Sequence, residues 1–242
     1  MVEPLFHKDN LVAEVGSLVE LDGPEGKHAV QVRRMRQGEA IQLSDGKGLR
    51  VRGTVAQLTG STLKFEVLEV IKEEMPSRRI TLVQALAKGD RDELAIQAAT
   101  ELGVMGIIPW QASRSISRWD GPKISKGQAR WQQIVSEAAK QSLRAFTPEV
   151  KNIVDTKDLA SLVSSFDLVL VLDTSATISI GEAGIPSSGS IALVVGPEGG
   201  IEQSELDALE AAGAKLVSLG ANVLRTSTAG PALIAALMLG NV

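Results

Sequence analysis

The sequence predicts an α/β protein whose larger, C-terminal part contains a mainly parallel sheet, preceded by a small β-barrel domain. The sheet is indicated by the apolar, β-rich runs Leu168–Leu172 and Ile191–Val195, which are typical of strands covered on both faces. Helical patterns alternate with such runs, and this alternation favours parallel pairing. The barrel is indicated by short extended runs joined by tight turns, of which Asp45-Gly46 is the clearest.

A polar segment at residues 72–77 separates the two parts. Its Pro76 disfavours a helical conformation at Met75, and the hydrophobic period changes after it. We therefore expect one domain at residues 1–72 and a second at residues 77–242.

The first domain is expected to be mostly β-structure. Extended runs are predicted at Ile41–Leu43, Leu49–Leu58 and Leu63–Ile71, with a turn at residues 59–61. One helix is predicted over Pro24–Met35, because proline is favoured in the first turn of a helix. Short strands with a single helix suggest a small barrel.

The second domain alternates between strand and helix patterns. Strands are predicted at Ile80–Leu86, Ile107–Trp110, Leu168–Leu172, Ile191–Val195 and Leu216–Leu219. Helices are predicted at Asp92–Leu102, Gln128–Leu143, Glu202–Ala212 and Thr228–Leu239.

The composition excludes several kinds of chemistry. The 242 residues contain no Cys and only two His, so disulfides, zinc–thiolate sites, iron–sulfur clusters and three-His metal sites are not expected. The fingerprints of dinucleotide-binding folds, P-loop NTPases and zinc proteases are absent. No leader pattern and no apolar run of about 18 residues is present, so we expect a cytoplasmic protein without a membrane contact.

Charge is distributed unevenly along the chain. The formal net charge is −4, but Lys and Arg outnumber Asp and Glu within residues 76–150, and Arg33, Arg34 and Arg36 form a basic run. These regions are consistent with a surface that faces a polyanion. The alternative is a set of ordinary solvated helix faces.

Two loops carry the strongest functional signals. The sequence GPEGG at residues 196–200 directly follows a buried strand, and its glycines allow a ligand to approach the backbone closely. The sequence LGANVLRTSTA at residues 219–229 also follows a strand and contains Arg225 among small and apolar residues. Both signals also have an ordinary interpretation. The GPEGG sequence could be a simple connection between a strand and a helix. Arg225 could be a structural ion-pair partner rather than a group that holds an anion.

Together these two loops resemble the C-terminal half of the SPOUT methyltransferases. Residues 87–119 and 129–150 are similar to the RsmE-type enzymes of that superfamily, and residues 28–48 are similar to their PUA-like barrel. The resemblance implies a knotted α/β domain that binds S-adenosyl-L-methionine and methylates N3 of a uridine in 16S ribosomal RNA. It covers nearly the whole chain, in order.

The last loop departs from the family at two positions. The family commonly has Arg and Glu where this chain has Asn222 and Ser227. Any role of the missing Glu toward the cofactor is therefore open.

The resemblance also implies the site residues. The cofactor-binding residues would be Leu172, Gly196, Pro197, Gly199, Gly200, Leu219, Gly220, Val223, Leu224, Thr226, Thr228 and Ala229. Arg225 is the candidate for stabilising an anionic uracil, and Glu198 is a candidate base for the N3 proton. The alternative role of Glu198 is to accept hydrogen bonds from nearby backbone N–H groups. No metal is needed, because the cofactor supplies the electrophile.

Contacts to RNA would come from basic side chains on both domains. The candidates are Arg33, Arg34, Arg36, Lys88, Arg91, Arg114, Arg118 and Arg144. A base could stack near Trp119, which lies close to two of them in sequence. The target would be 16S ribosomal RNA, expected within the small ribosomal subunit. A homodimer is implied, with Pro231–Leu239 as a candidate contact.

Two alternatives remain open. A ribose 2′-O RNA methyltransferase of the same superfamily would share the pocket but activate a hydroxyl. A non-catalytic RNA-binding protein with this fold is kept open by the departures at Asn222 and Ser227.

Overall fold

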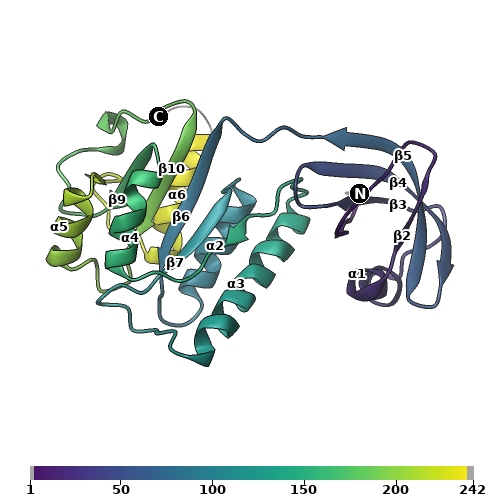
Figure 1. Ribbon diagram of the computed structural model, residues 1–242, viewed down its shortest axis with the longest axis horizontal. Coiled ribbons are helices and arrows are strands. Elements are labelled where there is room, and N and C mark those ends of the chain that lie inside the picture. The colour runs from purple at the N-terminus through teal and green to yellow at the C-terminus, as the bar shows by residue number, and fades with distance from the viewer. Residues whose placement is uncertain (1–2, 239–242) are drawn as a thin grey trace. The chain divides into compact units, whose positions relative to one another are not determined.

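The computed structural model describes residues 3–238, which form two structural units (Figure 1). The first unit contains the chain up to Met75 together with Ala139–Thr147. The second contains Pro76–Ala138 and the chain from Pro148 onward. A single boundary in sequence does not describe this division, because the chain returns once to the first unit.

The first unit is built on a five-stranded sheet in the order β1-β3-β4-β5-β2. Its strands are β1 (Leu5–His7), β2 (Leu18–Leu21), β3 (Ala40–Ser44), β4 (Leu49–Thr59) and β5 (Thr62–Lys72). β1 pairs with β3 in parallel, and the other pairs are antiparallel. The three predicted runs are confirmed, and β1 and β2 were not predicted.

One core lies inside this sheet. Each strand contributes at least one buried side chain to it, among them Phe6, Val19, Ile41, Val51 and Phe65. A sheet whose strands all share one interior curls around it, as the barrel prediction requires. Within the β3–β4 hairpin, Gly46 has a φ of 69°, which explains why the predicted turn has glycine there.

The predicted helix over Pro24–Met35 is wrong in length and type. The structure has a short α-helix, α1 (Gly23–Lys27), followed by one π-helical segment, η1 (His28–Val32). Arg34 then has a φ of 56°, a left-handed conformation that ends the helix.

The segment Ala139–Thr147 belongs to the first unit through hydrogen bonds to the β3–β4 region. The carbonyl of Ala145 accepts bonds from the backbone N–H of Gly48 at 3.0 Å and from Ser44 Oγ at 3.3 Å. Lys140 Nζ also pairs with Glu25 Oε1 at 2.7 Å. Such contacts link residues about a hundred positions apart, and no local pattern predicts them.

The second unit contains a six-stranded sheet in the order β11-β9-β10-β6-β7-β8, and every neighbouring pair is parallel. Its strands are β6 (Arg78–Ala85), β7 (Gly106–Trp110), β8 (Glu149–Val150), β9 (Leu168–Leu172), β10 (Gly189–Val195) and β11 (Lys215–Val217). The predicted parallel sheet is confirmed. Only the two-residue strand β8 was not predicted.

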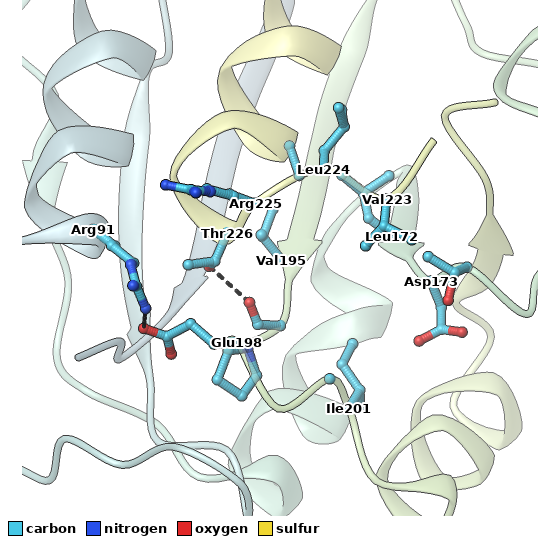
Figure 2. A pocket seen from close by; sticks show the side chains of 15 residues that line it. Arg91, Leu172, Asp173, Val195, Glu198, Ile201, Val223, Leu224, Arg225 and Thr226 are labelled. Carbon is cyan, nitrogen blue, oxygen red and sulfur yellow. Dashed lines mark hydrogen bonds and ion pairs between the residues drawn. The ribbon is translucent and has the colours of Figure 1, made fainter. Parts of the chain in front are cut away.

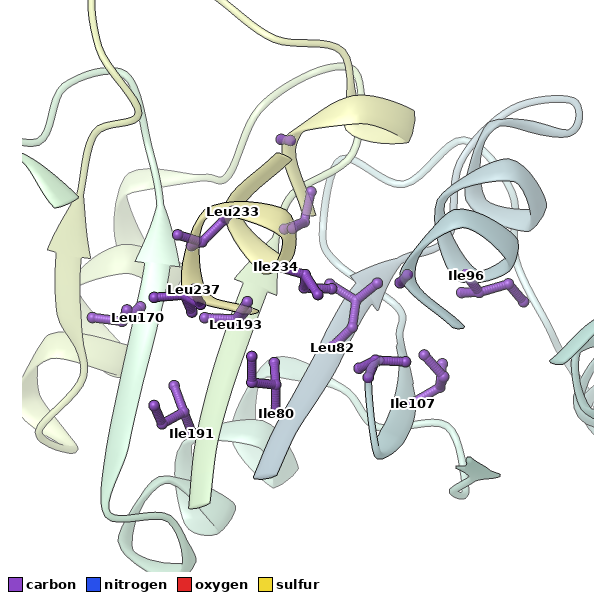
Figure 3. Packing of buried hydrophobic residues seen from close by; sticks show 14 of the residues in the cluster. Ile80, Leu82, Ile96, Ile107, Leu170, Ile191, Leu193, Leu233, Ile234 and Leu237 are labelled. Atoms are coloured by element: carbon purple, nitrogen blue, oxygen red, sulfur yellow. The ribbon is translucent and has the colours of Figure 1, made fainter. Parts of the chain in front are cut away.

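Helices cover both faces of this sheet. They are α2 (Arg91–Glu101), α3 (Pro122–Gln141), α4 (Thr156–Leu162), α5 (Gln203–Ala211) and α6 (Thr226–Met238). Side chains of α2, α3 and α6 share one core with Leu82 and Leu193, whereas those of α4 and α5 share another with Val83 and Val194. Figure 3 shows α6 lying on the first of these cores. Alternate residues of each strand therefore serve opposite layers.

Most predicted helices are present, with different bounds. α3 begins six residues before its predicted start, and α4 was not predicted at all. α6 begins at Thr226, and the predicted last residue of that helix, Leu239, lies outside the described residues.

Candidate functional site

A cavity of about 410 Å³ opens at the carboxyl ends of the parallel strands (Figure 2). It is lined by residues that follow β6, β9 and β10 and by the segment that leads into α6. In the sheet order, β6, β7 and β8 extend to one side of β10, while β9 and β11 extend to the other. The cavity therefore lies where the strand order reverses, which is where open α/β sheets bind ligands. Its size falls within the range of small-molecule sites, about 300–1,000 Å³.

The GPEGG loop forms one wall of the cavity. Gly196 must be glycine for a steric reason, because a Cβ there would lie 2.6 Å from Cγ1 of Ile201. Gly200 has a φ of 74°, a conformation that glycine adopts readily. The carbonyl of Gly196 accepts a 2.8 Å hydrogen bond from Thr226 Oγ1, drawn in Figure 2. The loop is thereby attached to the first turn of α6.

Glu198 is held by the loop that follows β6. Its Oε1 accepts bonds from Arg91 Nη1 at 2.7 Å and from the backbone N–H of Lys88 at 2.9 Å. Partial burial favours a higher pKa for Glu198, but its hydrogen bonds with backbone N–H groups and with Arg91 outweigh burial, so the pKa lies below its ordinary value. The side chain is therefore an ionised, paired carboxylate.

Arg225 has a different environment. The residue is exposed at the start of α6 and lines the cavity. Within residues 3–238, its guanidinium has no hydrogen-bond or ion-pair partner. In Figure 2 it extends toward the side of the cavity where Arg91 lies. Its charge is therefore available to a ligand.

Asp173, which directly follows β9, supplies the second carboxylate of the cavity wall. Its Oδ1 accepts bonds from the backbone N–H of Ser175 at 2.8 Å and from Ser175 Oγ at 2.6 Å. Within the described part of the chain, no cationic side chain pairs with it. Asp173 was not predicted as a site residue, although its position immediately after a predicted parallel strand was a usable signal.

The structure brings together most of the predicted cofactor residues. Those lining the cavity are Leu172, Gly196, Pro197, Gly200, Val223, Leu224, Thr226 and Ala229. Leu219 and Gly220 line an adjoining space of about 80 Å³, which shares Asp173 with the larger cavity. Gly199 and Thr228 line neither. Besides Asp173, the cavity residues not predicted for this role are Arg91, Thr174, Val195 and Ile201.

The predicted RNA-contact residues differ in their exposure and in whether their side chains already have a partner. Arg33, Arg34 and Arg36 are exposed on the first unit. On the second unit, Lys88, Arg114 and Arg118 are also exposed, and the last two donate to the carbonyls of Gly199 and Ser113. Arg91 is engaged by Glu198. Arg144 is half-buried in the first unit, where burial lowers its pKa to about 10.

Trp119, near which a stacked base is expected, has contacts within the second unit. Trp119 packs edge-on against Trp131, with ring centroids 5.1 Å apart. Its ring also covers Gly127, where a Cβ would lie 2.4 Å from it. The indole is half-buried against the core of the second unit, and the stacking of a base near it stays a prediction.

Residues 3–238 contain neither a cluster of metal-ligating side chains nor a helix able to span a membrane. No three His, Asp or Glu side chains lie together in a way that could hold a metal ion. No described helix has the length and apolar character needed to cross a membrane.

Family models match both parts of the chain. The model described as RNA methyltransferase domain matches residues 73–238, and that described as RNA methyltransferase PUA domain matches residues 21–68. The chain belongs to the RNA methyltransferase family. Its parallel sheet, with a ligand-sized cavity at the carboxyl edge and a small β-domain before it, agrees with this class.

Within that family, the chain is similar to proteins named Ribosomal RNA small subunit methyltransferase E. It is 43% identical to the one from Mycobacterium bovis, over 98% of this chain and 91% of the relative. The one from Bacillus subtilis is 32% identical over 86% of this chain and 85% of the relative. The crystal structure of the one from Neisseria gonorrhoeae, bound to S-adenosyl methionine, is 32% identical with a TM-score of 0.89 and covers 98% of both chains. The RsmE-type resemblance is confirmed.

Proposed function

We propose that this chain transfers the methyl group of S-adenosyl-L-methionine to N3 of a uridine in 16S ribosomal RNA of the small subunit. The names of the similar proteins and the cofactor in the related crystal structure support this proposal. The observation that carries it is a cavity at the carboxyl edge of the sheet, lined by Arg225 and Asp173. Within residues 3–238, the Arg225 guanidinium has no partner and the Asp173 carboxylate has no cationic partner.

The cavity residues fit the cofactor. S-adenosyl-L-methionine carries an ammonium, a sulfonium and a carboxylate, so its net charge is positive. Because Glu198 is already paired with Arg91, Asp173 is the carboxylate able to hold the ammonium. Leu172, Val223 and Leu224 offer apolar faces for the adenine. When bound, the cofactor supplies an electrophilic methyl group, so no metal or covalent nucleophile is required.

Arg225 is assigned to the substrate. Uridine N3 must lose its proton before it can attack a methyl group, and the anionic uracil then needs a positive partner. The unpaired guanidinium of Arg225 at the cavity mouth can stabilise this anion through charge-assisted hydrogen bonds. An Arg already neutralised by a carboxylate, as Arg91 is, would do so much less well.

Glu198 is assigned to positioning rather than to proton removal. A general base works best when its pKa is near the working pH, whereas the pKa of Glu198 is lowered by its hydrogen bonds. The carboxylate also accepts a hydrogen bond from the backbone N–H of Lys88. Accepting bonds from backbone N–H groups was the alternative role expected for Glu198 from the sequence.

The RNA surface is proposed to include Arg33, Arg34 and Arg36. They lie at the end of η1 or directly after it, and all three are exposed. Their side chains have no hydrogen-bond or ion-pair partner in the described part of the chain. Cationic side chains that neutralise phosphates displace the counterions condensed on the RNA, and this release contributes a large share of the binding affinity. Lys88, Arg114 and Arg118 extend the proposal to the second unit.

The remaining predictions concern assembly. In α6, Pro231, Leu233, Ile234 and Leu237 are buried within the second unit, which leaves Met238, 45% exposed, as its large free apolar side chain. Leu94 on the neighbouring α2 is 49% exposed. A homodimer contact made through α6 would therefore use these two side chains rather than the buried apolar face of the helix. The knot, the dimer and the cytoplasmic location stay predictions.

The first test is methyl transfer from labelled S-adenosyl-L-methionine to small ribosomal subunits from a strain lacking this protein, followed by nucleoside mass spectrometry. We expect 3-methyluridine. A 2′-O-methyl nucleoside would assign the chain to ribose chemistry instead. Cofactor binding without any product would favour the non-catalytic RNA-binding alternative, and Ser227→Glu would then be the variant to test.

A further inference from the structure

Gln84 is a fully buried polar side chain next to the cavity, and none of the roles above uses it. It lies near the end of β6, with an exposed fraction of 0%, directly opposite Val195 of β10. Along β6 it is on the same face as Ile80 and Leu82, which belong to the core beneath α6. A glutamine therefore occupies a position where the strand pattern calls for an apolar residue.

The hydrogen bonds of Gln84 determine the orientation of its amide. Nε2 donates to Thr226 Oγ1 at 2.8 Å and to the carbonyl of Ala85 at 3.1 Å. Thr226 Oγ1 donates its single proton to the carbonyl of Gly196 at 2.8 Å. Because that proton is used, the hydroxyl can only accept from Gln84. The bonds thus run in one direction, from Gln84 through Thr226 to the first residue of the GPEGG loop.

This arrangement leaves one polar atom without compensation. Oε1 of Gln84 is buried and has no partner within residues 3–238. Burying an unpaired amide oxygen is unfavourable, and an apolar side chain of similar size would avoid that cost. Folding of the strand alone does not account for glutamine at this position.

We infer that Gln84 is a positioning residue for the cofactor site. It holds the Thr226 hydroxyl so that the hydroxyl fixes the Gly196 carbonyl, and it thereby joins the GPEGG loop to the turn that carries Arg225. Thr226 consequently acts through its hydrogen bond to the loop, and its hydroxyl proton is not available to the cofactor. This inference rests on the proposed function, because it takes S-adenosyl-L-methionine as the ligand of the cavity.

The test measures cofactor affinity separately from stability. The dissociation constant of S-adenosyl-L-methionine is measured by calorimetry, and the melting temperature of the ligand-free protein is measured alongside, for the full chain and its variants. Gln84→Met should weaken binding about tenfold, as expected for losing a buried hydrogen bond, without lowering the melting temperature. Thr226→Val should weaken binding similarly, whereas Thr226→Ser keeps the hydroxyl and should bind like the unmodified chain. The double variant should lose about as much as either single one.

A pH profile tests the direction of the bonds. In Gln84→Glu, a protonated carboxyl can still donate to Thr226, but an ionised one can only accept. The Thr226 hydroxyl would then turn from Gly196 toward the carboxylate. We expect the affinity of Gln84→Glu, relative to the unmodified chain, to fall as the pH rises from about 6 to about 8.5, since burial raises the pKa of such a carboxyl.

The outcomes separate this inference from the proposed function. If the unmodified chain binds the cofactor and both Gln84→Met and Thr226→Val bind within about twofold of it, the inference is overturned while the function stands. A Gln84→Met variant that loses stability and affinity together would reduce Gln84 to a structural residue, and Thr226→Val against Thr226→Ser would then decide the role of the hydroxyl. An unmodified chain that does not bind the cofactor would overturn both.

Discussion

Arg91 and Glu198 form an ion pair that joins two of the loops around the cavity. Nη1 of Arg91 lies 2.7 Å from Oε1 of Glu198, although the residues are 107 positions apart in sequence. The same oxygen accepts the backbone N–H of Lys88. One carboxylate therefore connects the segment after β6 with the loop after β10 and leaves Arg225 as a free cation at the site.

Glu198→Gln is expected to affect cofactor binding more than the chemical step. The amide keeps an acceptor for the Lys88 N–H but loses the charge-assisted bond to Arg91, so affinity for S-adenosyl-L-methionine should fall roughly three- to tenfold. The rate at saturating cofactor should change little. Calorimetry and a methylation assay measure the two effects, with Glu210→Gln, an exposed position on α5, as the control. A large loss of rate at saturating cofactor would instead return Glu198 to the role of general base.

The backbone hydrogen bonds of Glu198, together with its ion pair to Arg91, predict a direction for the acid dependence of folding. The pKa of Glu198 is lowered in the folded state, so the folded protein binds this proton less tightly than the unfolded chain. The stabilisation is fully present above the unfolded value of 4.5 and is lost as the pH falls through the lower folded value. Urea denaturation of the unmodified chain and of Glu198→Gln below and above that window measures this difference.

Arg225→Ala is expected to remove turnover while preserving the fold and cofactor affinity. Removing a group that stabilises charge in the transition state costs about 10²–10³-fold in rate. Arg225→Lys should recover only part of the loss, because lysine lacks the planar fork of donors. Single-turnover methylation of small subunits provides the measurement. Rates near those of the unmodified chain would remove Arg225 from the mechanism.

Asp173→Asn is expected to discriminate between ligands with and without an amino-acid portion. If the carboxylate holds the ammonium, affinity for S-adenosyl-L-methionine should fall by about tenfold or more. Affinity for 5′-methylthioadenosine, which lacks the ammonium, should be nearly unchanged. Equal losses for both ligands would place Asp173 near the nucleoside portion instead.

Arg33→Ala combined with Arg36→Ala is expected to weaken RNA binding and to reduce its salt dependence. Each phosphate contact contributes about 0.7–0.9 to the slope of log K against log salt, so the slope should fall by up to about 2. The matched control is Arg52→Ala on the same unit, because Arg52 is already paired with Glu3 and Glu69. Filter binding across salt concentrations gives the slope. An unchanged slope in the double variant would move the RNA surface elsewhere.

Asp92 predicts a second, opposite pH dependence of stability. Burial raises the pKa of Asp92 from 3.8 to about 6, although its carboxylate accepts N–H bonds from Ala87 and Glu93. The folded state therefore holds this proton more tightly than the unfolded chain, and stability should fall as the pH rises from about 4 to about 6. Asp92→Asn should flatten the curve in that window. A slope that persists in the variant would have to come from another group.

The sequence predicted those elements whose signals are local. The β3–β4 hairpin, the apolar strands β9 and β10 and the GPEGG loop all depend on residues near one another in the chain. The prediction of one helix over Pro24–Met35 was wrong in length and type, because the local pattern cannot distinguish an α-helix from a short helix followed by a π-helical segment. α4 was not predicted, because its 7 residues make less than two helical turns and show no clear period.

The sequence by itself determined the class of protein. Its alternating periods predicted a parallel sheet, and the resemblance of its two loops to the SPOUT methyltransferases implied the activity and a role for Arg225. Only the tertiary structure decided what each charge does. Arg91 is neutralised by Glu198, Asp173 has no cationic partner within residues 3–238, and Gln84 reaches the cofactor loop through Thr226. The physical reason is that partners 30 to 142 positions apart in sequence neutralise Arg91 and set the direction of the hydrogen bonds from Gln84 through Thr226 to Gly196.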